Sequence, residues 1–124
     1  MITILLVDDS PTVRAMVSEL LRSKGIEVVE ANDGIEAIEK IQAKCPDLVI
    51  TDIVMPKMNG YELCRWIKTQ LKDQNLPVIM CTSKNQQFDH YWGMKQGADA
   101  YITKPFQPVD LIKVIKKLLQ QVRH

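Results

Sequence analysis

The sequence predicts an α/β fold, a doubly wound parallel sheet of five strands covered on both faces by five helices. A chain of 124 residues suits a single domain. Short apolar runs alternate five times with stretches of helical periodicity. These runs are nearly continuous rather than alternately apolar and polar, which is typical of strands buried on both faces of a parallel sheet. We therefore expect right-handed crossovers and the common strand order 2-1-3-4-5.

Each expected strand is short and contains Val, Ile or Leu, and the five cover residues 2–7, 26–31, 47–51, 77–81 and 98–103. The first helix is capped by Ser10, opened by Pro11 and stopped by Gly25. Its expected inner face is Val13, Met16, Val17, Leu20 and Leu21. Asp33 and Glu36 have capping-box spacing for the second helix, which Pro46 ends. The expected inner face of that helix is Ile35, Ile38 and Ile41.

The third helix is expected to begin at Asn59 or Gly60 and to run to about Leu71, with Leu63, Ile67 and Leu71 inside. A fourth is expected over residues 84–96, although Gly93 in its interior costs about 1 kcal/mol relative to Ala. Pro108 opens the last helix. Its expected inner face is Leu111, Ile115, Leu118 and Val122.

Charge and composition exclude several classes of protein. The net charge of +1 gives no bulk attraction to nucleic acid or to an anionic membrane. The apolar run at the N-terminus is too short to span a bilayer and follows no basic segment. The three cysteines, Cys45, Cys64 and Cys81, show no metal-binding spacing and are expected to be free thiols. We therefore expect a cytoplasmic protein with no nucleic-acid partner and no membrane insertion.

Polar residues stand where four of the apolar runs end. Asp8 and Asp9 follow the first run, Asp52 the third, Thr82 the fourth and Lys104 the fifth. In the predicted sheet these ends share one edge, and the first and third strands are neighbours. Any one of these aspartates alone would be read as a turn or cap residue. Three crowded carboxylates repel one another, so together they predict a site for Mg²⁺, with Lys104 as a nearby positive charge.

With these motifs in place, the sequence closely resembles a response-regulator receiver domain of the stand-alone, CheY-like kind. The resemblance covers residues 2–122, so we expect a single domain over residues 1–124 with no output domain. It implies a flavodoxin-like fold. The motifs that carry it are Val7-Asp8-Asp9-Ser10, Asp52 with Met55-Pro56 and Asn59-Gly60, Thr82-Ser83, Gly97-Ala98-Asp99-Ala100-Tyr101 and Lys104-Pro105-Phe106.

The resemblance implies a role for each acidic residue. Asp52 resembles the phosphoacceptor, whose carboxylate attacks a phosphoryl group held on a histidine of a partner kinase. Asp9 resembles the direct Mg²⁺ ligand, and Asp8 resembles its neighbour, which acts mainly through metal-bound water. The resemblance implies that the backbone carbonyl of Val54 is the third protein ligand. Mn²⁺ is expected to substitute for Mg²⁺.

Other family roles fall on the later strands. Lys104 resembles the lysine that pairs with the acceptor and then with the phosphoryl group, and its bond to Pro105 is expected to be cis. Thr82 resembles the hydroxyl that moves to a phosphoryl oxygen, while Tyr101 matches the aromatic switch position. Val54 and Lys84 occupy the positions that tune phosphoryl lifetime, for which we expect a long value because Val54 cannot hydrogen-bond an attacking water.

The expected output surface is the fourth helix, fifth strand and fifth helix. Lys95, Lys113, Lys116 and Lys117 make it basic. Phe88, Tyr91 and Trp92 cannot all face inward, so Tyr91 or Trp92 either contacts a partner or packs locally. We expect a monomer or weak dimer that receives phosphate from a histidine kinase or phosphotransfer domain and controls a partner protein.

The resemblance to regulators of chemotaxis, twitching and phototaxis favours a motility target. A phosphate sink or a phosphorelay intermediate fits the same residues. A Mg²⁺-dependent aspartyl-phosphate phosphatase fits less well, because such enzymes carry Asp-x-Asp after the first strand, so we expect a signalling protein rather than an enzyme. A flavin-binding flavodoxin is disfavoured because Asp8 and Asp9 would repel a phosphate. A receiver that serves only as an interaction module would not need the complete acidic set.

Overall fold

Five parallel strands form one sheet in the order β2-β1-β3-β4-β5, as predicted. The computed structural model describes residues 1–83 and 97–122. Its strands are β1 (Thr3–Val7), β2 (Glu27–Ala31), β3 (Leu48–Asp52), β4 (Val78–Ser83) and β5 (Ala100–Lys104). The register pairs Val7 with Ala31 and Thr51, Asp52 with Cys81, and Thr82 with Thr103. The carboxyl ends of the strands therefore share one edge.

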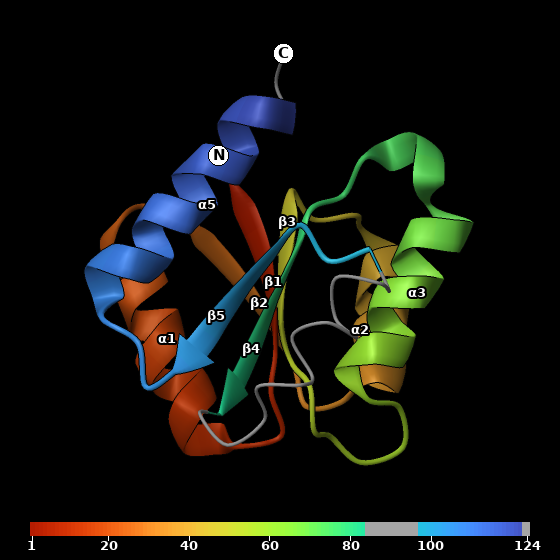
Figure 1. The fold of residues 1–124 in the computed structure, drawn as a ribbon, viewed down its shortest axis with the longest axis horizontal. Coiled ribbons are helices and arrows are strands. Elements are labelled where there is room, and N and C mark those ends of the chain that lie inside the picture. Colours follow the sequence, from red (N-terminus) through yellow and green to blue (C-terminus); the bar gives the residue numbers. More distant parts are fainter. Residues whose placement is uncertain (84–96, 123–124) are drawn as a thin grey trace.

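Helices cover both faces of this sheet (Figure 1). The described helices are α1 (Pro11–Ser23), α2 (Gly34–Ala43), α3 (Gly60–Gln70) and α5 (Pro108–Val122), with a 3₁₀ turn at Lys72–Gln74. In Figure 1, α1 and α5 lie on one side of the strands, and α2 and α3 lie on the other. Four of the five predicted helices are thus present. The remaining one, the fourth predicted helix over residues 84–96, lies outside the described residues, together with Lys84, Phe88, Tyr91, Trp92 and Lys95.

The two faces of the sheet bury separate apolar clusters. Towards α2 and α3, strand residues such as Leu5 and Val49 pack with Ile41, Leu63 and Ile67. Towards α1 and α5, strand residues pack with Val17, Leu21, Leu111, Ile115 and Leu118. Burying apolar side chains on both faces explains why the strand sequences are nearly continuous in apolar residues.

Side-chain caps begin three of the helices where the sequence predicts them. Ser10 accepts a hydrogen bond from the Val13 amide, and Asp33 accepts one from Glu36. Asn59 and Glu62 form a reciprocal capping box at the start of α3. Ser10 and Asp33 stand within three residues of the ends of β1 and β2, whereas Asn59 follows β3 after the loop of residues 53–58. The caps thus fix where each helix begins beside the edge that carries the polar residues. No helix within residues 1–83 and 97–122 is long and apolar enough to cross a membrane.

Two residues expected inside the core are exposed instead. Met16 is 65% exposed and Ile35 is 43% exposed. In α1 the buried stripe is centred on Val17 and Leu21 and includes Ser18, which lies on the side of Val17 opposite to Met16. Met16 instead lines an open groove of about 400 Å³ beside the β5–α5 connection, with Val13, Leu20, Phe106 and Pro108 among its other lining residues. The helix turns its stripe towards the sheet, and this leaves Met16 outside.

Candidate functional site

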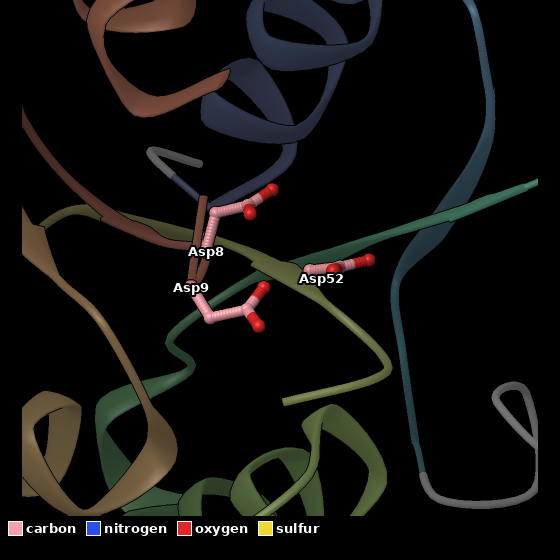
Figure 2. Close-up of side chains that lie close together, drawn as sticks. All are labelled: Asp8, Asp9 and Asp52. Carbon is pink, nitrogen blue, oxygen red and sulfur yellow. The ribbon is translucent and has the colours of Figure 1, made fainter. Parts of the chain in front are cut away.

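Three carboxylates meet at the carboxyl edge of the sheet. Asp8 and Asp9 follow β1, and Asp52 ends the neighbouring strand β3. One oxygen from each lies within 4.8 Å of the others, and Figure 2 shows the three side chains leaving the two strands on the same side. Asp8 is buried, Asp52 is half-buried and Asp9 is exposed. The convergence expected from the strand ends is therefore present, and it opens to solvent at Asp9.

Asp8 is held through both its carboxylate and its backbone. Its Oδ1 accepts a hydrogen bond of 2.9 Å from the Ser10 amide, and its Oδ2 accepts one of 2.9 Å from Lys104 Nζ. Its own amide donates to the Ala31 carbonyl at 3.1 Å. Its carbonyl accepts a 2.6 Å hydrogen bond from Arg14 Nη1. Strand β2, helix α1 and strand β5 thus fix one residue from three directions.

Lys104 places a single cation among these carboxylates. Its Nζ lies 2.9 Å from Asp8 Oδ2 and 3.5 Å from Asp52 Oδ1. Burial opposes the charged form of Lys104, but the hydrogen bond to Asp8 and the charges of Asp52 and Asp8 outweigh it and raise its pKa. The peptide bond from Lys104 to Pro105 is cis. Lys104 therefore stays protonated beside Asp52 over the neutral pH range.

The pKa of Asp52 is also raised above its ordinary value. Burial is the largest cause and Asp8 adds to it, while Lys104 and the Ile53 amide act in the opposite direction. Within residues 1–83 and 97–122, Lys104 is the lysine that pairs with these carboxylates, and one positive charge does not balance three negative ones. Carboxylate oxygens at this spacing suit a hard divalent cation, and the exposed side at Asp9 leaves room for its water ligands. The residues therefore fit Mg²⁺ or Mn²⁺.

Gly60 packs against the backbone of Asp52, a contact that neither its predicted place at a helix start nor the Asn59-Gly60 receiver motif indicates. Its amide donates to the Ile53 carbonyl at 2.8 Å. A Cβ at Gly60 would lie 2.3 Å from the Asp52 carbonyl oxygen, which no real side chain tolerates. The first turn of α3 can pack directly against the Asp52 backbone because residue 60 has no side chain. The Asn59-Gly60 pair predicts the start of a helix, but only the fold reveals this contact.

The remaining predicted residues occupy different depths. Thr82 is buried at the end of β4, next to the strand that carries Asp52. Tyr101 is half-buried on β5 and packs against the cluster beneath α2 and α3. Val54 is 61% exposed two residues after Asp52. The described contacts bring together Asp8, Asp9, Asp52 and Lys104. Thr82, Tyr101 and Val54 lie on neighbouring segments, and Lys84 lies outside the described residues.

Comparison with known proteins places this arrangement in a family. The model for the response regulator receiver domain matches residues 4–116. The alkaline phosphatase synthesis transcriptional regulatory protein PhoP of Bacillus subtilis is 38% identical over 120 residues, which are 95% of this chain and 48% of PhoP. The chain thus spans about half the length of PhoP. Protein PilH of Pseudomonas aeruginosa is 38% identical over 119 residues, covering 96% of this chain and 98% of PilH.

Solved structures show the same likeness. The chemotaxis response regulator CheY4 of Vibrio cholerae superposes with a TM-score of 0.87 at 36% sequence identity. The match covers 95% of this chain and 98% of CheY4. A family model matching nearly the whole chain, together with the fold and the acidic edge, leads to one conclusion: the chain belongs to the response regulator receiver domain family of two-component signalling proteins.

Proposed function

We propose that this receiver accepts a phosphoryl group on Asp52 from a histidine kinase or phosphotransfer domain and then changes its contacts with a partner protein. The observation that carries the proposal is the position of Lys104, which reaches both Asp8 and Asp52 beside a third carboxylate. Asp9, Asp52 and the Val54 carbonyl would hold Mg²⁺ directly, and Asp8 would hold it through water. When bound, the ion supplies positive charge to the transferred phosphoryl oxygens.

The proposed transfer follows from these positions. A carboxylate oxygen of Asp52 attacks phosphorus in line with the bond to the donor histidine nitrogen. The oxygen–phosphorus bond forms, the nitrogen–phosphorus bond breaks, and its electron pair returns to the histidine. Lys104 stands ready to pair with the oxygens of the acyl phosphate, which adds about two negative charges. Asp52 must be ionised to attack, so neutralising the crowded site favours the reaction by lowering its raised pKa.

Thr82 and Tyr101 are the proposed switch residues. They lie on adjacent strands, where the register pairs Tyr101 with Met80 and Thr103 with Thr82. Movement of the Thr82 hydroxyl towards an oxygen of the new phosphoryl group would change the packing beside Tyr101. The proposed output surface is β5 and α5 with the segment over residues 84–96. Differential contacts of the two states with a partner would then transmit the signal.

CheY4 of Vibrio cholerae, described as a chemotaxis response regulator, supports a motility target for this chain. The exposed aliphatic side chain of Val54 offers no hydrogen bond to an attacking water, which supports a slow loss of the phosphoryl group. Transfer of the group onward to another protein, as in a phosphate sink or relay, is the alternative. A pull-down with the beryllofluoride-bound protein separates the two, because only a regulator gains a partner in that state.

The direct test is phosphorylation in vitro with acetyl phosphate and Mg²⁺, followed by intact mass. The wild type is expected to gain one phosphoryl group, and chelation of Mg²⁺ to prevent the gain. Asp52→Asn is expected to abolish it, whereas the matched change Asp99→Asn, at the opposite edge of the sheet, is expected to leave it intact. An adduct that survives in Asp52→Asn would contradict the proposal.

A further inference from the structure

Arg14 contacts the acidic site through the backbone of Asp8 and not through a carboxylate. Its Nη1 donates a 2.6 Å hydrogen bond to the carbonyl of Asp8, which belongs to the peptide that joins Asp8 to Asp9. The side chain is only 19% exposed, and its backbone amide bonds to the Ser10 carbonyl at 3.0 Å in the first turn of α1. Arg14 thus reaches back from α1 to hold the peptide on which the carboxylate of Asp9 depends.

The guanidinium is itself held from strand β2. Arg14 Nε lies 3.3 Å from Glu30 Oε1, and Glu30 Oε2 lies 3.6 Å from Arg22 Nη2. Arg22 also donates to the Val28 carbonyl at 3.3 Å, and none of the contacts among the described residues joins it to Asp8. Arginine suits this position because its planar fork presents several donors in fixed directions, and one nitrogen can face Glu30 while another faces Asp8.

We propose that Arg14, braced by Glu30, is a positioning residue that sets the divalent-cation affinity of the acidic site. It holds the Asp8–Asp9 peptide so that the carboxylate of Asp9, which is exposed, points towards Asp52. Rotation of that peptide would carry Asp9 away from the other two carboxylates. Arg14 would contact neither the ion nor the phosphoryl group. This inference rests on the proposed Mg²⁺ site.

The sign of the effect separates positioning from plain electrostatics. Arg14 carries a positive charge close to a site for a cation, so removing that charge would strengthen Mg²⁺ binding if charge alone mattered. Loss of an oriented ligand weakens metal binding instead, on the order of 10-fold for residues that support a ligand. The two explanations therefore predict opposite changes for Arg14→Met.

The test measures Mg²⁺ affinity by titration calorimetry, with Mn²⁺ electron paramagnetic resonance as a second readout. Arg14→Met is expected to weaken Mg²⁺ on the order of 10-fold. Arg14→Lys keeps the charge but lacks the fork, and it is also expected to weaken binding. Arg22→Met is the matched control, since it removes an arginine from the same Glu30 without touching Asp8, and its affinity should match the wild type. Thermal melts in chelator check that each variant folds.

Each outcome bears on a distinct claim. Tighter or unchanged Mg²⁺ binding in Arg14→Met, or equal weakening in Arg22→Met, would overturn the role of Arg14. A wild type that binds no Mg²⁺ would overturn the proposed function instead. Should Arg14→Met fail to fold, Glu30→Gln provides the second variant, because it leaves Arg14 in place but removes its brace. A smaller loss of affinity is expected there, and wild-type affinity would contradict the proposal.

Discussion

Two lysines of this receiver each pair with aspartate, at opposite edges of the sheet, and the surroundings of the two pairs differ. At the amino edge, Lys68 Nζ lies 2.6 Å from Asp99 Oδ2 and donates to the Leu76 carbonyl at 2.9 Å. The same Asp99 oxygen accepts from the Val78 amide at 2.8 Å. One cation meets one anion, and backbone groups supply the remaining partners. This pair ties α3 to the starts of β4 and β5.

At the carboxyl edge, Lys104 faces a larger negative charge. Lys104 lies 2.9 Å from Asp8 and 3.5 Å from Asp52, and Asp9 joins the same group. The pKa of Asp52 is raised chiefly by burial, with Asp8 adding to the shift despite Lys104. A lysine–aspartate contact therefore does not by itself mark a functional site. An excess of negative charge is the better mark of such a site, because it favours the binding of an added cation.

The largest expected difference concerns stability with and without Mg²⁺. Lys68→Met and Lys104→Met should each lower the free energy of unfolding by about 1–3 kcal/mol in chelator, because the first leaves the carbonyl of buried Leu76 without its donor and the second leaves buried Asp8 without its lysine. Added Mg²⁺ should stabilise Lys104→Met more than the wild type, since the ion takes over the missing positive charge. Mg²⁺ should stabilise Lys68→Met by the same amount as the wild type. Urea unfolding with and without Mg²⁺ measures these differences. If Mg²⁺ raised the free energy of unfolding equally in all three proteins, the expected difference between the two lysines would be contradicted.

The same chemical change should have opposite signs at the two edges. Asp52→Asn removes a carboxylate whose raised pKa shows that its charge is disfavoured in the fold, so it should stabilise the protein in chelator. Asp99→Asn removes the charge opposite Lys68 and should destabilise by on the order of 1 kcal/mol. Thermal melts compare the two, and a stabilising Asp99→Asn would show that the Lys68 pair is not balanced.

The gain from Asp52→Asn should depend on pH. Because the folded pKa of Asp52 lies above its ordinary value of 3.8, the unfolded state loses this proton first as the pH rises. Ionisation therefore costs the wild type stability between the unfolded and folded pKa values. The difference between variant and wild type should be small below 3.8, grow as the pH rises, and level off above the folded pKa. Urea unfolding at several pH values in chelator measures it, and a difference that shrinks with rising pH would contradict the assignment.

The smallest expected effect is on the buried thiols near the two lysines. Burial raises the pKa of Cys64 to about 11 despite Lys68, and that of Cys81 to about 12 despite Lys104. Neither lysine activates the nearby thiol, because burial outweighs the positive charge and the aspartates add to the rise of the thiol pKa. Iodoacetamide should therefore label exposed Cys45 first and label the other two only on unfolding. Rapid labelling of Cys81 in the folded protein would show that Lys104 is less occupied than the contacts indicate.

Most of the fold and much of the site could be predicted because their signals are local. The caps at Ser10, Asp33 and Asn59 act over three residues, and they begin helices where the sequence places them. Apolar runs that stop at Asp8, Asp52 and Thr82 mark strand ends. The parallel topology then brings those ends to one edge.

Packing between distant segments decided the rest. The hydrogen bond of Lys104 to Asp8 joins residues 96 positions apart in the sequence. Lys104 lies closer to Asp8 than to Asp52 because of the way β5 lies in the sheet. The exposure of Met16 depends on how α1 is rotated against the sheet, which periodicity alone fixes only coarsely. The sequence by itself therefore determined which residues reach the edge and with what chemistry. Only the tertiary structure decided which lysine faces more negative charge than it can neutralise. The reason is that the charge balance depends on every neighbour within a few ångströms and not on the order of residues in the sequence.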